Sequence, residues 1–254
     1  MGETAVAKKT VRLIISRQDS PDSKPYTEEF EIPYRPNMNV ISALMEIQRN
    51  PVNAQGKKTT PVAWESNCLE EVCGACSMVI NGKARQACTA LIDKLEQPIR
   101  IEPMRKFPVL RDVIVDRSRM FNTLKRIKAW IPIDGTYDLG PGPRMAEKER
   151  QRNYESSKCM TCGVCLEVCP NINGRNSFIG SFAINQVRLF NAHPTGKMNA
   201  EERLDALMED GGIEGCSNSQ NCVQACPKGI PLTTSIAEIN LQTTKHLFKK
   251  WLRS

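Results

Sequence analysis

The sequence predicts an α+β protein of two parts, a strand-rich module over residues 1–108 and an all-α module over residues 109–254. In the first part, short β-rich runs are separated by turn residues, and only one stretch has a helical period. In the second part, helical patterns are interrupted by loops that contain cysteine. The eleven cysteines are crowded into three short stretches, one in the first module and two in the second.

The first module is expected to hold a small sheet and a single helix. The helix is predicted over 39–50 with Asn39 as its N-cap. A type I′ hairpin is predicted within 77–88, because an Asn-Gly pair stands between two short strands. The apolar face of the helix consists of Val40, Leu44 and Ile47, and further strands are expected at 10–18, 28–34 and 98–103.

The second module is expected to begin with a long helix over 110–130. Residues 131–144 are too rich in Gly and Pro for regular structure and are predicted to form a connector. Helical patterns follow at 145–157, 181–191, 199–210 and 232–251.

Composition and charge restrict the class of protein. No apolar run approaches the ~18 residues of a spanning helix, and the start of the chain lacks the apolar segment of a secretory signal. The net charge of +7 raises nucleic acid as a partner. However, no arginine-rich tract or basic motif interleaved with aromatic residues is present, so no nucleic acid is expected. The densest basic stretch, KHLFKKWLRS, fits docking at a membrane surface or a subunit, or an exposed helix end.

The first cysteine group has the spacing C-x4-C-x2-C-x11-C, and its first three members match the plant-type [2Fe–2S] pattern. Gly74 gives the backbone freedom to wrap around a cluster, and the hairpin can bring the fourth cysteine back to it. The alternative is a zinc site, but such sites usually pair two C-x2-C knuckles and only one is present. The predicted ligands are Cys68, Cys73, Cys76 and Cys88.

The other two groups are copies of one motif. Residues 159–170 read CMTCGVCLEVCP, the bacterial ferredoxin run, and residues 216–227 read CSNSQNCVQACP. In two-cluster ferredoxins the fourth cysteine of each run ligates the other cluster, so the two runs are expected to exchange their last cysteines. A [4Fe–4S] cluster is then predicted on Cys159, Cys162, Cys165 and Cys226. The second cluster is predicted on Cys169, Cys216 and Cys222.

The second copy lacks one thiolate, because Ser219 stands where the first copy has Cys162. A four-iron cube with an empty ligand position readily loses its corner iron, so this cluster is expected to be [3Fe–4S]. The alternatives are that Ser219 supplies an alkoxide or that water completes a four-iron cluster. The three sets use all eleven cysteines, and none is left for a disulfide or for nucleophilic catalysis.

Catalysis on a substrate is not visible in the sequence. The only histidines are His193 and His246, and a lone histidine is more often structural than catalytic. No Gly-rich phosphate loop follows a strand, so no dinucleotide site is predicted. The remaining function is a one-electron relay in which the cofactors supply the chemistry.

The module order and the motifs CLEEVCGACSMVINGK, RDVIVDRSRMF and QNCVQACPKGIPL resemble the iron–sulfur subunits of succinate dehydrogenase and fumarate reductase. The resemblance covers nearly the whole chain and is closest to the Gram-positive succinate:menaquinone type. It implies a β-grasp ferredoxin-like module followed by an α-helical ferredoxin module. Ubiquinone-using members carry aromatic residues soon after the cysteine that matches Cys169. CPNINGRN has none, so no quinone contacts are assigned.

The resemblance also implies partners and a location. Electrons would pass from the FAD of a flavoprotein subunit through [2Fe–2S], [4Fe–4S] and [3Fe–4S] to menaquinone or another quinone at a haem-containing membrane anchor (cytochrome b). The chain would not itself bind succinate, and it would lie at the cytoplasmic face of the cell membrane, peripheral through its partner subunits. Three alternatives stay open: the same relay run as a fumarate reductase, a heterodisulfide-reductase-like subunit, and a zinc-stabilised basic scaffold.

Overall fold

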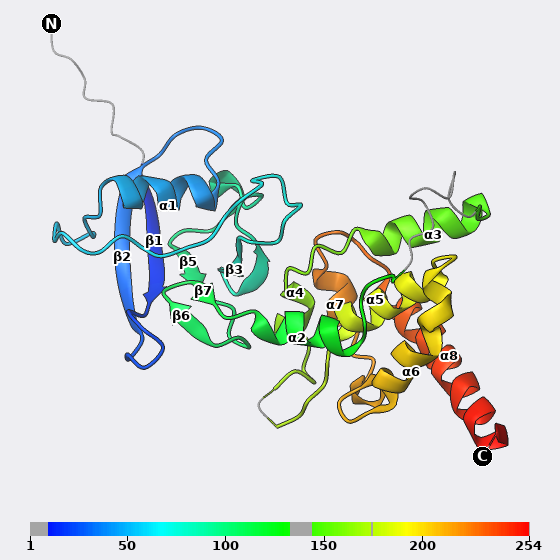
Figure 1. The fold of residues 1–254 in the computed structure, drawn as a ribbon. Helices are drawn as coiled ribbons and strands as arrows, with labels where there is room; N and C mark the ends of the chain where they lie inside the picture. The colour runs from blue at the N-terminus through cyan, green and yellow to red at the C-terminus, as the bar shows by residue number, and fades with distance from the viewer. Residues whose placement is uncertain (1–9, 133–143, 174, 254) are drawn as a thin grey trace, which may run out of the picture. The chain divides into compact units, whose positions relative to one another are not determined.

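The computed structural model describes residues 10–132, 144–173 and 175–253 (Figure 1). The chain divides into two compact units, the first ending at Asp116 and the second beginning at Arg117. This division falls later than the boundary expected after residue 108. Most of the connector expected over 131–144 lies outside the described residues.

The first unit is built on a five-stranded mixed sheet with the strand order β2-β1-β5-β3-β4. Strand β1 is antiparallel to β2 and parallel to β5, whereas β3 is antiparallel to both β4 and β5. One helix, α1, lies along the sheet (Figure 1), so the expected combination of strands and a single α-helix is confirmed. The elements are β1 Thr10–Arg17, β2 Tyr26–Pro33, α1 Val40–Arg49, β3 Ser77–Ile80, β4 Lys83–Gln86, the short 3-10 helix η1 Ile92–Lys94 and β5 Ile99–Glu102.

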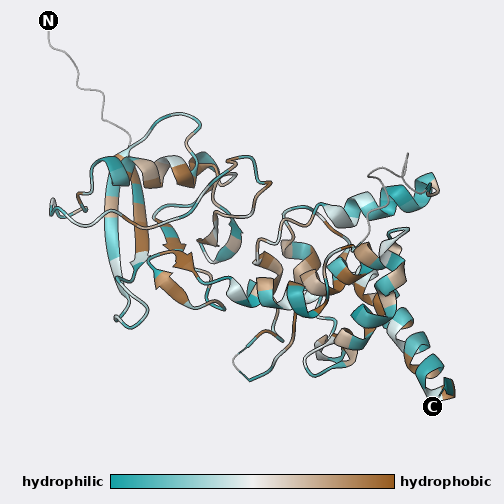
Figure 2. Ribbon diagram, viewed as in Figure 1, coloured by the Kyte–Doolittle hydropathy of each residue, from teal (hydrophilic) through white to brown (hydrophobic). Residues whose placement is uncertain are grey.

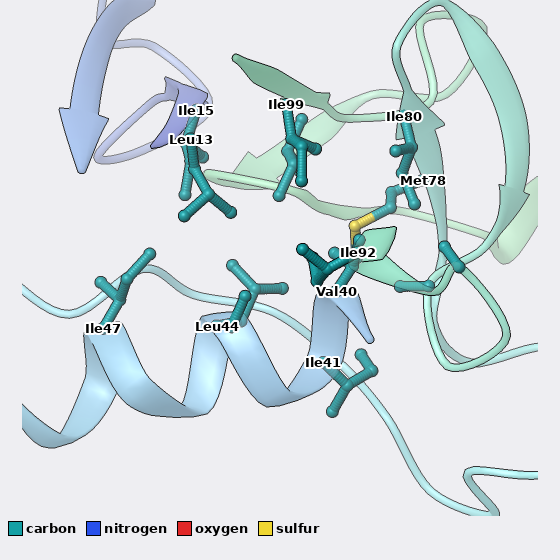
Figure 3. Packing of buried hydrophobic residues seen from close by; sticks show 14 of the residues in the cluster. Leu13, Ile15, Val40, Ile41, Leu44, Ile47, Met78, Ile80, Ile92 and Ile99 are labelled. Carbon is teal, nitrogen blue, oxygen red and sulfur yellow. The ribbon is translucent and has the colours of Figure 1, made fainter. Parts of the chain in front are cut away.

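The core of the first unit lies between α1 and the sheet (Figure 3). Val40, Leu44 and Ile47 of α1 are fully buried, as their helical spacing predicts. Leu13 and Ile15 of β1 are buried on the helix side, because alternate residues of a strand share one face. Burial of each such Leu or Ile side chain contributes ~1.5–3 kcal/mol to folding. The contact therefore holds α1 firmly on the sheet.

Two local features position the cysteines of this unit. Asn81 and Gly82 join β3 to β4 with φ values of 48° and 77°, the type I′ turn predicted from the Asn-Gly pair. Asn39 caps α1, because its side-chain oxygen accepts the backbone N–H of Ser42 at 2.8 Å. The Asn39 amide also donates to the carbonyl oxygen of Cys88 at 2.8 Å. The start of α1 is thereby tied to the fourth predicted ligand.

The long helix predicted over 110–130 is wrong in its first half, where the chain forms a small antiparallel sheet. Asp112 lies at the turn of that sheet with a φ of 47°. Its carboxylate accepts hydrogen bonds from Arg17 Nε at 2.8 Å and from the backbone N–H of Ala63 at 2.7 Å. Because a buried guanidinium is costly without a charged partner, this long-range contact overrides the local helical pattern. The elements are β6 Val109–Arg111, β7 Ile114–Val115 and α2 Ser118–Arg126, the last in the second unit.

The second unit is helical, with no strand among its described residues. Helix α5 packs against α3, α4, α6 and α8 and forms the centre of the unit. The helical patterns predicted from residue 145 onward are confirmed. None of the helices in the described ranges has the length and apolar character that a membrane crossing requires. The helices are α3 Glu147–Ser157, α4 Val164–Glu167, α5 Ser181–Ala192, α6 Ala200–Met208, α7 Asn221–Ala225 and α8 Leu232–Arg253, with 3-10 turns η2 Gly196–Asn199 and η3 Ile213–Gly215.

Three candidate cysteine centres

The cysteine loop of the first unit is tightly wound. Leu69, Glu71 and Gly74 have positive φ values of 62°, 56° and 73°. This left-handed backbone is unfavourable for residues other than glycine, so surrounding contacts must hold Leu69 and Glu71 in it. Such alternation of backbone conformation is typical of loops that turn several N–H groups toward one anion.

In this loop the N–H groups point at sulfur. Cys68 Sγ accepts hydrogen bonds from the backbone N–H groups of Glu70, Val72 and Cys73 at 3.4, 3.3 and 3.3 Å. The N–H of Ala75 donates to Cys73 Sγ at 3.4 Å. Such donors favour the thiolate, and the N–H groups of Glu70 and then Val72 are the main reasons that the pKa of Cys68 is lowered to about 7. The loop is therefore shaped to hold negatively charged sulfur.

Cys76 and Cys88 lie deeper, in the core of the first unit. Burial raises the pKa of the Cys88 thiol to about 11, and the neighbouring Cys76 thiol acts in the same direction. The Thr89 hydroxyl donates to Glu71 Oε1 at 2.8 Å, which ties the chain next to Cys88 to the loop between Cys68 and Cys73. The first unit thus brings Cys68, Cys73, Cys76 and Cys88 into one neighbourhood.

A buried polar chain beside Cys76 was not foreseen. Cys76 Sγ donates to Gln86 Oε1 at 3.5 Å, and Gln86 Nε2 donates to Ser77 Oγ at 2.8 Å. Ser77 Oγ in turn donates to the carbonyl oxygen of Gly74 at 2.9 Å. The hairpin register carries the signal that could have found it, because a two-residue turn at Asn81 places Gln86 opposite Ser77.

In the helical unit, cysteines of the two runs meet in two hollows. The first hollow lies beside the turn that leads into α4 and the residue that follows α7. Burial raises the pKa of Cys162 to about 11, and burial likewise raises the pKa values of Cys159 and Cys165. Apolar side chains of Phe182, Ile230 and Leu232 form part of its wall. Its cysteines are Cys159, Cys162, Cys165 and Cys226.

The second hollow has a more polar wall, with serine, asparagine and glutamine among its lining residues. Ser219 is one of its lining residues, and so is Ser181, whose side chain acts to lower the pKa of Cys222 against the larger effect of burial. Cys169 lies here and not in the first hollow, although it belongs to the first run. The cysteines of the second hollow are Cys169, Cys216 and Cys222.

Asparagine side chains join the loops that form the second hollow. Asn171 donates to the carbonyl oxygen of Gly215, and its own side-chain oxygen accepts the hydroxyl of Ser217 at 3.0 Å. Asn221 donates to the carbonyl oxygen of Val168 at 3.1 Å. These bonds span the two cysteine runs, and no pattern in the sequence indicated them.

The donor chemistry of these centres fits iron–sulfur clusters. Thiolates are the soft ligands that such clusters use, and neither hollow is lined by a histidine or a carboxylate. The eleven cysteines all lie in the described ranges, and no disulfide joins them. Within those ranges, no three His, Cys, Asp or Glu side chains are arranged to hold a single metal ion. The two hollows instead gather four and three thiols, as clusters of several irons require.

The fold and the cysteine centres together define a two-domain iron–sulfur protein of the ferredoxin type. Residues 12–122 match the family described as a 2Fe-2S iron-sulfur cluster binding domain. Residues 155–230 match the family described as a 4Fe-4S dicluster domain. Each match covers the cysteines that the structure gathers in the corresponding unit.

Relatives along the full chain specify the family further. The chain is 71% identical to the succinate dehydrogenase iron-sulfur subunit of Bacillus subtilis, over 97% of this chain and 98% of the relative. It is 32% identical to the fumarate reductase iron-sulfur subunit of Mycobacterium tuberculosis, with 91% of each chain covered. The chain therefore belongs to the family of succinate dehydrogenase and fumarate reductase iron–sulfur subunits, as its motifs predicted.

A solved structure supports the fold independently. A chain of the Mycobacterium smegmatis Sdh1 complex in the apo form superposes with a TM-score of 0.75 at 23% identity. The match covers 95% of this chain and 98% of that chain. The predicted α+β fold, a 2Fe-2S ferredoxin domain followed by a helical 4Fe-4S domain, is confirmed.

Proposed function

We propose that this chain is the electron-relay subunit of a succinate dehydrogenase that delivers electrons to quinone. The observation that carries the proposal is the 71% identity over 97% of the chain to a protein named as that subunit. The fumarate reductase relatives are more distant, at 32% and 28% identity, which favours succinate oxidation as the working direction. Neither the heterodisulfide-reductase alternative nor the zinc scaffold accounts for this likeness.

Three cysteine sets would hold the three clusters, each of which takes up and releases one electron at a time when bound. The chain's own residues supply thiolate ligands, backbone N–H donors at Cys68, and apolar side chains that line the first hollow. The proposed [2Fe–2S] ligands are Cys68, Cys73, Cys76 and Cys88. The proposed [4Fe–4S] ligands are Cys159, Cys162, Cys165 and Cys226, and those of [3Fe–4S] are Cys169, Cys216 and Cys222.

The three-iron assignment rests on the lining of the second hollow. It offers three thiols and the hydroxyls of three serines, Ser181, Ser217 and Ser219, of which Ser219 stands at the position of the missing cysteine and is exposed to solvent. A serine hydroxyl in water resists deprotonation, so it is a weak iron ligand compared with a cysteine thiolate. The second hollow therefore suits a cluster that needs three ligands, whereas the first hollow offers four.

The likeness to subunits of such enzymes supports a multi-subunit complex. We propose that the partners are an FAD-containing flavoprotein subunit, which gives electrons, and a haem-containing membrane anchor, where menaquinone or another quinone takes them. The chain would lie at the cytoplasmic face of the cell membrane and be held there mainly through these subunits.

The test is purification of the tagged chain from membranes in mild detergent. A flavoprotein should co-purify, the preparation should contain iron and acid-labile sulfide, and succinate should reduce its clusters. A preparation that contains zinc without sulfide would refute the cluster assignment. A preparation with clusters but without flavin would refute the succinate dehydrogenase assignment alone.

A further inference from the structure

The end of α8 carries an exposed apolar surface that the proposed relay does not use. Five of the exposed large apolar side chains of the described residues lie in the last thirteen residues of this helix. Trp251 and Leu252 are 70% and 76% exposed. Their neighbours in this surface are Leu241, Leu247 and Phe248.

These side chains form a stripe on one side of the helix. Leu247 and Trp251 are four residues apart, as are Phe248 and Leu252, so each pair lies one above the other. A different side of α8 packs on the rest of the unit, through Ile236, Ile239, Thr243 and His246. The exposed stripe is therefore not the margin of the helix core but a second apolar face.

The same helix end is strongly basic. The stretch LQTTKHLFKKWLR over 241–253 contains three lysines and one arginine and no acidic residue. Two of these cations face carboxylates of α6, since Lys250 Nζ lies 2.9 Å from Asp205 Oδ1 and Arg253 lies 3.9 Å from Glu201. Lys245 and Lys249 are exposed and have no ion pair within the described ranges.

The end of α8 projects from the helical unit. In Figure 1 the last turns of α8 extend beyond the other helices toward the lower edge of the helical unit. Figure 2 shows hydrophilic and hydrophobic colours alternating along these last turns of α8.

We propose that the last turns of α8, residues 241–253, lie in the headgroup region of an anionic phospholipid membrane. Tryptophan and other large apolar side chains flanked by lysine and arginine are the composition of helices that lie in this interface. The charge of the patch selects an anionic surface, and it disfavours a second copy of the same basic patch. The contact is reversible and adds to the attachment that partner subunits provide.

Asp205 of α6 holds the end of α8 in place. Its carboxylate accepts a hydrogen bond from Lys250 and lies 2.9 Å from His246 Nε2, so α8 is held to α6 within the segment that carries the exposed stripe. The stripe is thus presented by a rigid helix and not by a frayed end.

The experiment uses the full chain with its clusters, purified without partner subunits and mixed with lipid vesicles. Vesicles of phosphatidylcholine that also contain phosphatidylglycerol should sediment with the protein at low salt, and vesicles of phosphatidylcholine alone should not. The tryptophan fluorescence should shift to shorter wavelength on binding, and Trp251→Phe should remove most of that shift. Added salt should release the protein, because screening weakens the lysine contribution.

Two double variants separate charge from apolar contact. Lys245→Gln with Lys249→Gln should weaken binding roughly 30-fold, because each lysine near an anionic leaflet contributes about 1 kcal/mol. Phe248→Ser with Leu252→Ser should reduce binding to charged vesicles to a similar or greater degree. The matched control is Lys57→Gln with Lys58→Gln, two exposed lysines of the first unit, which should leave binding unchanged.

Three outcomes would overturn the proposal. One is equal binding to charged and uncharged vesicles, and another is an equal loss of binding in the Lys57 and Lys58 control. The third is self-association through the α8 stripe with no vesicle binding, which would assign this surface to a protein contact. Iron and sulfide are measured in each variant as a control for folding. A variant that keeps its clusters but loses vesicle binding has lost the lipid contact and not its fold.

Discussion

The cysteine loop of the first unit and the hollows of the helical unit present their thiols in opposite ways. In the loop, the backbone itself donates to sulfur, and the pKa of Cys68 is lowered to about 7 by the N–H groups of Glu70 and Val72. In the first hollow, burial dominates and raises the pKa of Cys162 to about 11. The backbone thus stabilises Cys68 as a thiolate before any metal arrives, whereas burial stabilises Cys162 as the neutral thiol, as it also does Cys88 in the core of the first unit.

The difference shows what each region needs in order to form. The loop centre needs a short stretch of chain and one hairpin, because Cys68 and Cys88 lie within it. The first hollow needs two distant runs, because Cys226 must come beside Cys162. Cluster binding in the helical unit must also displace protons from thiols whose pKa values are raised, so it is coupled to folding and to pH.

The largest expected effect comes from breaking the exchange between the two runs. Cys226→Ala should abolish the cluster proposed on Cys159, Cys162 and Cys165 and reduce succinate oxidation to background, because a thiolate of the first hollow is lost. Cys169→Ala is the matched control and should damage the other cluster of the unit. Electron paramagnetic resonance of the oxidised and reduced protein tells them apart. If each variant damages the cluster of its own run, the exchange does not exist.

A variant of the loop should act only locally. Cys73→Ser should remove the [2Fe–2S] signal and leave both helical clusters intact, since its contacts lie within the first unit. Electron transfer from flavin to quinone should still fall sharply, because the relay loses its first member. Iron and sulfide analysis with spectra of the reduced protein provides the measurement. Loss of the four-iron signal while [2Fe–2S] survives would contradict the separation of the two regions.

A smaller and more specific change is expected at the second hollow. Ser219→Cys should add the missing thiolate and allow a [4Fe–4S] cluster, whose extra negative charge makes it harder to reduce. The oxidised wild-type protein should show the paramagnetic signal of [3Fe–4S], and the variant should lose it. A wild-type protein that is silent when oxidised and holds four irons here would mean that Ser219 or water ligates iron.

The smallest expected effect concerns the support of the loop centre. Asn39→Ala removes the cap of α1 and the hydrogen bond to the Cys88 carbonyl, so the free energy of unfolding should fall by ~1–2 kcal/mol. Asn39→Ser keeps a capping oxygen and should lose only part of that amount. Denaturant unfolding of the two variants measures the difference. Equal losses would show that the cap itself contributes nothing.

Local signals in the sequence predicted much of the fold. The Asn-Gly pair gave the β3–β4 hairpin, and Asn39 marked the start of α1, because turn and cap geometry depend on neighbouring residues. The apolar spacing of the stretch after Pro108 predicts a helix. The hydrogen bond from Arg17 to the carboxylate of Asp112 instead holds this stretch in a strand–turn–strand conformation. Arg17 is too far away in the sequence for a local pattern to indicate this contact.

In the candidate centres, the cysteines could be predicted from the sequence but the side chains that support them could not. The cysteines could be predicted as sets because their spacing is itself the signal, and these sets remain proposals that the variants above would test. The supporting side chains could not be predicted, because no local pattern marks them. Asn171 and Asn221 matter because they cross from one run to the other, which depends on how the helices pack.

The buried ion pair between Arg17 and Asp112 also decides where the protein can be dissected. A fragment cut after Pro108 would keep the Arg17 guanidinium in its core and discard Asp112, leaving Glu28 as its remaining carboxylate. Removing one partner of a buried pair costs ~3–5 kcal/mol, a large share of the ~5–15 kcal/mol that stabilises a typical domain. An N-terminal fragment should therefore end at Asp116, where the β6–β7 turn is complete. Fragments that differ by these few residues would give a soluble ferredoxin domain in one case and an aggregating one in the other.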